Sequence, residues 1–222
     1  MRLLPFFRHL WRACAIACVI ASPAGAQIAA PPAGTAPRAR IAIDETLAAP
    51  AALLTERRPA GSVALAARLT VRLDALRDAA TIEAIDARAT ALLARDVSLW
   101  IAVESPPPAA ADLDAWAASV NALITRLRTR LTWLEIEFTN AGEPRLAAFA
   151  VKRASVDLHS AAPAGRLLAG GSPIGDAAWL DRVYGEDVAS YLDGLAAPFT
   201  TGGRAALDAV AKHDPGVARS RA

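Results

Sequence analysis

The sequence alternates short apolar stretches with stretches of helical periodicity. Residues 97–105, VSLWIAVES, are almost entirely apolar until Glu104, and the prolines that follow end the stretch. Residues 131–138, LTWLEIEF, alternate apolar and polar side chains with a period of two. Between them, residues 112–130 repeat apolar side chains at helical spacing. A strand, a helix and a second strand in this order predict a parallel sheet with helical crossovers.

The same alternation extends over most of the chain. Thr81 and Asp112 are expected to cap two helices, and Pro144 suits the first turn of a third. The pattern predicts one α/β domain over residues 41–212, either a (β/α) TIM-barrel-like fold or an open doubly wound sheet. We expect strands at 41–47, 62–73, 97–105, 131–138, 166–173 and 191–199, a helical turn or loop at 48–59, and helices at 81–96, 112–130, 143–160, 176–185 and 202–212.

The N-terminal residues have the pattern of a secretory signal peptide. Three arginines and no acid precede an apolar run that ends in Ala24-Gly25-Ala26, a small-x-small cleavage site. The run is too short for a stable membrane span. We therefore expect residues 1–26 to be removed on export to the periplasm or the exterior. Residues 27–40 are expected to form a flexible leader rich in proline and alanine, and residues 213–222 a polar tail.

Cleavage would change the chemistry of the chain. Cys14 and Cys18 would leave with the signal, so the mature protein would have neither a disulfide nor a thiol nucleophile. The basic residues would fall from 24 to 21, against 22 acidic ones, and no basic cluster for nucleic acid is evident. No later run approaches the length of a transmembrane helix. The sequence lacks G-x-G-x-x-G and G-x-x-x-x-G-K-[ST] motifs, which argues against a nucleotide enzyme, and we expect no cofactor.

The segment from residue 97 to about residue 199 resembles (β/α)8-barrel glycoside hydrolases of the two-glutamate retaining clan. In that clan a helix with a tryptophan precedes a strand similar to W-E-I-W-N-E-P, and a later strand ends in Gly-Gly before a helix that begins near Trp-Leu. The corresponding segments here are DLDAWAASVNALITRLRTRLTWLEIEFTN, LAAFAVKRASVDLHSAAPAGRLLAGG and AAWLDRVYGEDVASYLDGLAAPF. The resemblance covers roughly half of the chain. It implies a barrel fold and a function related to glycosidic bonds.

The sequence departs from the family pattern at the catalytic motif. Aligning E-I-W-N-E onto residues 135–139 places Thr139 where the family has its acid/base glutamate, and Phe138 where it has asparagine. A shifted alignment would match Glu143-Pro144 to the family's Glu-Pro but would lengthen the loop. The later His-x-Tyr becomes Ala197-Pro198-Phe199. A complete barrel takes ~250 residues, so we expect a truncated barrel without the strands that carry the nucleophile.

Two glutamates near strand ends form the candidate catalytic pair. Glu104 and Glu137 lie at the C-terminal ends of strands that are expected to be neighbours, where barrel active sites are built. Retaining glycosidases hold their two carboxyl groups about 5 Å apart, which such a pair could match. Structural ion pairs make the same pattern, so these acids could instead be solvated or paired with arginine. Glu135, deeper on the same face, is expected to pair with an arginine, because an unpaired buried carboxylate is costly.

The same strand and the loop after it supply the candidate substrate-binding residues, which are Trp133, Glu135, Thr139 and Asn140. The tryptophans that remain after cleavage could form a sugar platform, although core packing is the favoured interpretation. His159 and His213 suit helix ends, and two distant histidines without cysteine predict no metal site.

Three functions fit these observations. The first is an exported, glycoside-hydrolase-like protein with weak or lost catalysis. The second is a non-catalytic module that binds a saccharide or a protein partner at the mouth of the strands. The third is an incomplete barrel whose open sheet edge associates with another copy, since an unpaired edge usually needs cover.

Overall fold

The computed structural model describes residues 40–45, 64–106, 112–196 and 208–214. They contain a six-stranded sheet in which each strand pairs in parallel with the next one along the chain. The strands are β1 (Arg40–Glu45), β2 (Ala64–Val71), β3 (Val97–Glu104), β4 (Leu131–Phe138), β5 (Arg166–Gly171) and β6 (Gly194–Ala196).

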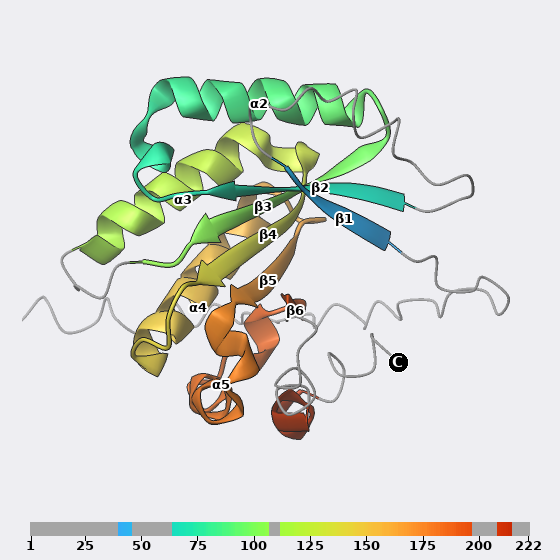
Figure 1. Cartoon of the computed structure of the whole chain (residues 1–222). Helices are drawn as coiled ribbons and strands as arrows, with labels where there is room; N and C mark the ends of the chain where they lie inside the picture. Colours follow the sequence, from blue (N-terminus) through green and yellow to red (C-terminus); the bar gives the residue numbers. More distant parts are fainter. Residues whose placement is uncertain (1–39, 46–63, 107–111, 197–207, 215–222) are drawn as a thin grey trace, which may run out of the picture. The chain divides into compact units, whose positions relative to one another are not determined.

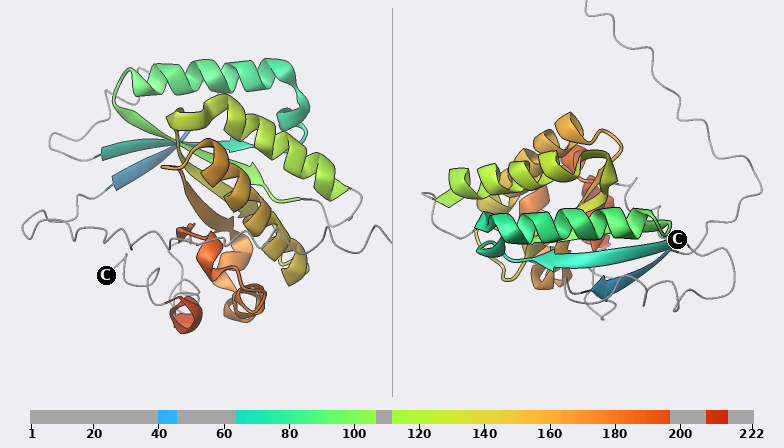
Figure 2. Two further views of the ribbon diagram at one scale, coloured as in Figure 1. Left: turned by 180° about the vertical axis from the view of Figure 1, so that it is seen from behind. Right: turned by 90° about the horizontal axis from the view of Figure 1, so that it is seen from above.

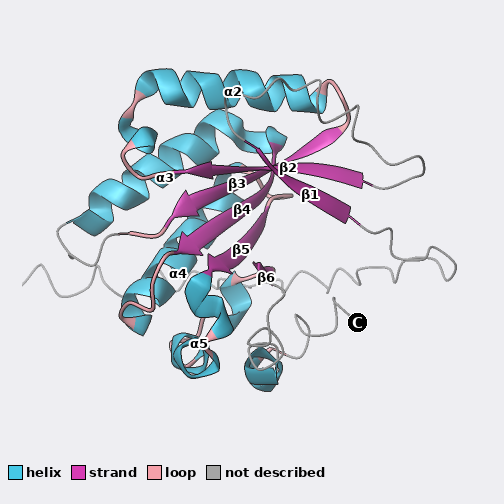
Figure 3. Cartoon of the chain, in the orientation of Figure 1, coloured by secondary structure: helices cyan, strands magenta, loops and turns pink. Residues whose placement is uncertain are grey.

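The strand order decides between the two architectures that the sequence allowed. A doubly wound sheet reverses its strand order at a switch point, whereas these strands follow the order of the chain without reversal (Figure 1). That order is the one of a (β/α) barrel. Within the described ranges no backbone pairing joins β6 to β1, so the strands form part of a barrel. The helices that follow β2 to β5 are α2 (Ala79–Leu93), α3 (Leu113–Leu127), α4 (Pro144–Ala161) and α5 (Ala177–Tyr184) (Figure 3).

The hydrophobic core lies between the sheet and the helices. Helices α2, α3 and α4 lie on one face of the sheet (Figure 2). Alternate residues of each strand point toward them, because successive side chains of a strand face opposite ways. In β3 these are Leu99, Ile101 and Val103, which are fully buried, and they join one core cluster with Trp116 of α3.

The other set of alternate residues forms what we call the inner face of the sheet. It carries Trp100 and Glu104 from β3, and Trp133, Glu135 and Glu137 from β4. The register sets Trp100 opposite Trp133, and Glu104 opposite Glu137. Polar and aromatic side chains of neighbouring strands therefore meet on this face.

Of the two predicted helix caps, Thr81 was wrong, and Asp112 was right in its position only. The N-cap of α2 is Asp78, whose carboxylate accepts hydrogen bonds from the backbone N–H groups of Ala80 (3.2 Å) and Thr81 (3.1 Å). Asp78, three residues before Thr81, binds the free N–H groups of the first turn. The helix therefore begins at Ala79, two residues earlier than predicted. Asp112 occupies the N-cap position of α3 but makes no capping side-chain bond. Pro144 at the start of α4 was predicted correctly.

Several sequence predictions fall outside the described residues. These include the signal peptide, most of the leader, the turn or loop at 48–59 and the Ala197-Pro198-Phe199 motif. The strand predicted at 62–73 ends earlier, at Val71. The last predicted helix is present over residues 208–213. None of the helices in the described ranges is both long and apolar enough to span a membrane.

Candidate functional site

A pocket of about 290 Å³ lies at the C-terminal ends of β3 and β4, and we call it the rim pocket. Glu104 and Ser105 come from the end of β3, and Thr139 and Asn140 from the loop after β4. Its remaining lining residues are Leu73, Pro106, Phe138, Gly142, Glu143, Leu146, Ala147 and Trp179. The pocket therefore combines carboxylate, hydroxyl and amide groups with an apolar wall, which is the composition of many small-ligand sites.

Two buried tryptophans hold the walls of this pocket. The indole N–H of Trp116 donates to the backbone oxygen of Glu104 at 2.9 Å. The indole N–H of Trp179 donates to the backbone oxygen of Gly142 at 2.8 Å, and its ring packs edge-on against Phe138. Both side chains are at most 1% exposed. The preference for core packing over a sugar platform is confirmed for these two residues, which also fix the ends of β3 and the loop after β4.

Glu104 is the predicted catalytic residue that reaches the rim pocket. Its carboxylate accepts a hydrogen bond from the backbone N–H of Leu73 at 3.3 Å, which ties the end of β3 to the segment after β2. Glu137 is opposite Glu104 in the strand register but does not line the pocket. Its carboxylate lies 3.4 Å from the guanidinium of Arg68 instead.

Arg68 of β2 is the central cation of the inner face. Its Nε and Nη2 atoms donate to the two carboxylate oxygens of Glu135 at 2.8 and 3.0 Å. The Glu135 side chain is only 2% exposed. The expected arginine partner of Glu135 is therefore confirmed, and the same guanidinium also contacts Glu137. One arginine thus compensates two of the three glutamates that the sequence singled out.

Two glycines of β5 allow the side chain and the backbone of β4 to approach closely. Gly170 is opposite Glu137 in register, and a Cβ at this position would overlap the carboxylate of Glu135. Gly171 has a φ of 97°, and a Cβ there would overlap the backbone of Phe138. The Gly-Gly pair is thus required by close approach and by backbone conformation.

Trp133, a predicted substrate-binding residue, lies on the inner face of the sheet and outside the lining of the rim pocket. Its ring centroid is 6.0 Å from that of Trp100, and the guanidinium carbon of Arg68 is 5.9 Å from the Trp100 ring. Glu135 and Trp133 both lie outside the lining of the rim pocket, whereas Thr139 and Asn140 belong to it. The binding roles of these four residues stay predictions.

Sequence reasoning missed Glu143 as a pocket residue. It precedes the first turn of α4, and its side chain lines the rim pocket together with that of Glu104. The signal was present in the Glu143-Pro144 pair, which the shifted alignment matches to the family motif. The loop of residues 139–142 intervenes, and a sequence does not show that such a loop folds back toward the neighbouring strand.

Other polar clusters in the described residues have structural explanations. Asp86 of α2 forms ion pairs with Arg130, and with Arg126 at 3.2 Å, which join α2 to the end of α3.

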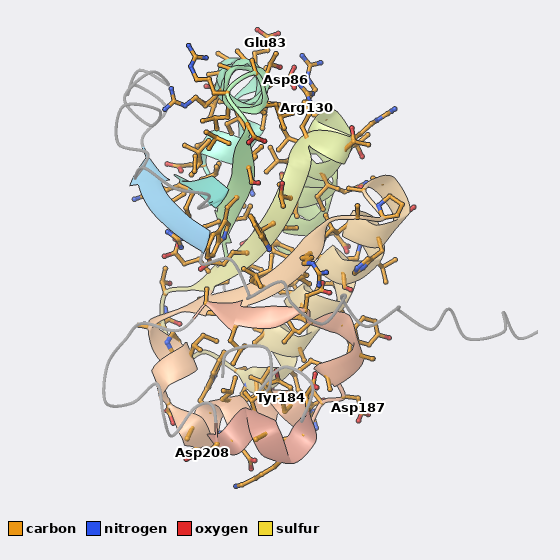
Figure 4. All side chains as sticks on the ribbon, turned by 90° about the vertical axis from the view of Figure 1, so that its right-hand side faces the viewer. Glu83, Asp86, Arg130, Tyr184, Asp187 and Asp208 are labelled. Carbon is orange, nitrogen blue, oxygen red and sulfur yellow. The ribbon has the colours of Figure 1, made fainter. Side chains whose placement is uncertain are left out.

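Tyr184 of α5 lies at the other end of the molecule from Asp86 (Figure 4). Burial, and to a lesser degree the charge of Asp214, raises the pKa of the Tyr184 hydroxyl.

Ser155, His159 and Asp193 resemble a catalytic triad in composition only. His159 Nδ1 donates to the backbone oxygen of Ser155 at 2.8 Å, so this nitrogen is not free to accept the serine proton. Its Nε2 atom is 4.0 Å from Asp193. The group links the end of α4 to the segment before β6. The described residues also contain no group of three or more side chains arranged to hold a metal ion.

No protein-family model matches the chain, and no curated protein matches it in sequence. Its fold is similar to that of solved glycoside hydrolase barrels. A structure of a fungal β-1,4-galactanase superposes with a TM-score of 0.50 at 13% identity, over 67% of this chain and 58% of that one. The exo-β-1,4-mannosidase Op5Man5 from Opitutaceae bacterium strain TAV5 gives a TM-score of 0.40 at 9% identity, over 70% of this chain and 43% of that one. The chain thus spans about half the length of these barrels. Its α/β architecture is that of a partial TIM barrel.

Proposed function

We propose that this protein is an exported, glycoside-hydrolase-like barrel protein that binds a saccharide at the rim pocket and hydrolyses it weakly or not at all. The observation that carries the proposal is the rim pocket itself. It opens where parallel barrels build their sites, at the C-terminal ends of the strands. Glu104, Glu143, Thr139 and Asn140 offer hydrogen-bonding groups to sugar hydroxyls. The half-buried side chains of Leu73 and Leu146 offer an apolar surface to a sugar ring.

The arrangement of carboxylates supports weak or lost catalysis. A glycosidase needs a carboxylic acid that protonates the leaving group and a second carboxylate at the scissile bond. Glu135 and Glu137 both contact the Arg68 guanidinium and lie outside the lining of the rim pocket, so neither carboxyl group reaches a sugar bound there. Thr139, which has no proton-donating carboxyl group, stands where the resembled motif has its acid/base residue. The pocket therefore retains binding groups more completely than catalytic ones.

Binding and hydrolysis are to be measured separately. β-1,4-Galactotetraose is the first probe, because the galactanase fold is similar. Isothermal titration calorimetry should give a Kd that rises about tenfold, or roughly 1.4 kcal/mol, in Asn140→Ala. Thr132→Ala, on β4 outside the pocket lining, serves as the control. Absence of binding by every oligosaccharide of a linkage panel, acidic ones included, would refute the saccharide proposal.

Catalysis is tested with the same oligosaccharides over long incubations. We expect no turnover, or a slow turnover that Glu104→Gln and Glu143→Gln each abolish. Turnover that survives both substitutions would exclude this pocket as the site of the chemistry. A hydrolysis rate typical of glycosidases would contradict the proposal of weak or lost catalysis.

Export is proposed from the N-terminal pattern. Expression of the full chain in a bacterium, followed by mass spectrometry of the periplasmic and medium fractions, should give a protein that begins at Gln27. Retention of Met1 in the cytoplasm would contradict it. Self-association through an open sheet edge remains a prediction, to be checked by light scattering of the purified chain.

A further inference from the structure

A second cavity continues the rim pocket toward the end of β2. It has a volume of about 360 Å³ and is lined by Arg72, Leu73, Asp74, Arg77, Glu104 and Asp112, and we call it the arginine hollow. Leu73 and Glu104 line both cavities. The two cavities are therefore adjacent, and we call them together the groove, which lies across the C-terminal ends of β2, β3 and β4.

The two arginines of this hollow have guanidinium N–H donors that are not used in hydrogen bonds within the described residues. The Arg72 side chain is 76% exposed and makes one long contact, from Nε to Asp74 at 3.4 Å. Arg77, in the last turn of the short helix η1 (Ala75–Arg77), is exposed and forms no ion pair with any described residue. A guanidinium has five N–H donors, so both side chains can donate to an added ligand. An exposed ion pair such as Arg72 with Asp74 contributes little to the free energy of unfolding. A ligand carboxylate can therefore replace Asp74 at Arg72 at little cost.

The acids of the hollow are held by backbone groups or by a helix end. Asp74 accepts a hydrogen bond from the N–H of Ala75 at 2.9 Å, and Glu104 accepts one from the N–H of Leu73 at 3.3 Å. Asp112 precedes α3, where the helix dipole favours a negative charge. Their remaining lone pairs can still accept hydrogen bonds from hydroxyl groups.

The two arginines of the hollow are complementary to the carboxylate of a sugar acid, and the three acids beside them are complementary to its hydroxyl groups. A uronate residue presents a carboxylate, which an arginine binds through paired N–H groups, and hydroxyls, which donate to carboxylates. The adjoining rim pocket has neutral polar groups on Thr139 and Asn140 and suits an uncharged sugar. We propose that the groove binds an oligosaccharide that contains uronate, with a uronate carboxylate at Arg72 and Arg77. This inference rests on the proposed saccharide binding and specifies the class of saccharide.

The test compares two ligands that differ only at C6, which carries a hydroxyl group in one and belongs to a carboxylate in the other. β-1,4-Galactotetraose and the same tetramer oxidised at its C6 hydroxyls to carboxylates are titrated into the purified protein. The oxidised tetramer should bind about tenfold more tightly at low salt, a difference of roughly 1.4 kcal/mol. The preference should shrink as salt rises, because both guanidinium groups are exposed.

Variants assign the preference to the hollow. In Arg72→Gln/Arg77→Gln the preference for the oxidised tetramer should be lost or reversed, because Asp74, Glu104 and Asp112 remain in the hollow. Arg182→Gln removes an exposed arginine of α5 outside the groove and should keep the preference. Thermal melts of all variants check that the fold is intact, and both substituted arginines lie on the surface.

Two outcomes overturn the inference in distinguishable ways. If the neutral tetramer binds as tightly as the oxidised one, or if the double variant keeps the preference, the uronate assignment fails and the saccharide proposal stands. If neither tetramer binds, and no other oligosaccharide of the linkage panel binds, both proposals fail together.

Discussion

Arg68 of β2 and Glu135 of β4 form a two-pronged ion pair across the intervening strand β3, with distances of 2.8 and 3.0 Å. Bidentate pairs of this kind fix geometry as well as charge. The pair lies on the inner face, beneath the strand ends that build the rim pocket. The pair therefore joins β2 to β4 across β3. Because Arg68 also contacts Glu137, its charge compensates two neighbouring glutamates of β4.

Arg68→Met should destabilise the fold strongly. The substitution leaves Glu135 buried without its cation, and breaking a buried pair in this way costs about 3 kcal/mol. Urea unfolding measures the free energy of unfolding. Arg153→Met is the matched control, because the Arg153 side chain is 48% exposed where it pairs with Asp157 at 2.9 Å on α4, and the variant should lose less than about 1 kcal/mol. Equal losses in the two variants would contradict the central role of Arg68.

Gly170→Ala should destabilise the protein through Glu135. The added Cβ would overlap the Glu135 carboxylate, and overpacking of this kind costs about 1–3 kcal/mol. In a Glu135→Ala background the obstructing carboxylate is absent, so the same substitution should cost much less. A double-mutant cycle on unfolding free energies measures the difference. A cost that is the same in both backgrounds would assign the effect to the backbone instead.

Trp179→Phe should weaken saccharide binding more than it weakens the fold. The substitution keeps most of the buried ring but removes the hydrogen bond to the backbone oxygen of Gly142. Loss of this bond costs about 1 kcal/mol of stability, and it releases the loop that carries Asn140. Calorimetry and urea unfolding on the same sample separate the two effects. Unchanged affinity for a bound saccharide would show that the loop is held by other contacts.

Acid unfolding should reveal the contact between Asp181 and His213. His213 Nε2 donates to the Asp181 carboxylate at 2.9 Å, and this hydrogen bond lowers the pKa of Asp181 from 3.8. A lowered pKa in the folded state means that the stabilisation is present above about pH 4 and is lost as the pH falls through the folded-state pKa.

The measurement compares the wild type with Asp181→Asn from pH 7 down to pH 2. The difference in unfolding free energy should be constant near neutral pH and should shrink below about pH 4. Asp187→Asn, at another exposed acid beyond the end of α5, is the control and should show a smaller effect. A difference that grows as the pH falls would have the wrong sign and would refute the assignment.

Local pattern was enough to predict most of the individual elements. The strand predicted at 131–138 has the bounds Leu131–Phe138, because its alternation is regular and Arg130 and Thr139 mark its ends. Pro144 lies in the first turn of α4, as predicted, since proline fits that turn, and the helix begins one residue later than the predicted bound at 143. The cap of α2 was misassigned because Asp78 and Thr81 are both good caps, and only the backbone geometry chooses between them.

The sequence by itself determined that strands and helices alternate, that the sheet is parallel, and that Glu135 needs a cation. These properties depend on side-chain periodicity and on the cost of a buried charge, which neighbouring residues already specify. Tertiary structure alone decided the strand order, the choice of Arg68 as that cation, and the meeting of Glu104 with Glu143 in one pocket. Arg68 and Glu135 are 67 residues apart in the chain. Contacts between residues this far apart depend on which strands pair, in which register, and on where the loops after the strands lie. A local sequence pattern does not specify these relationships.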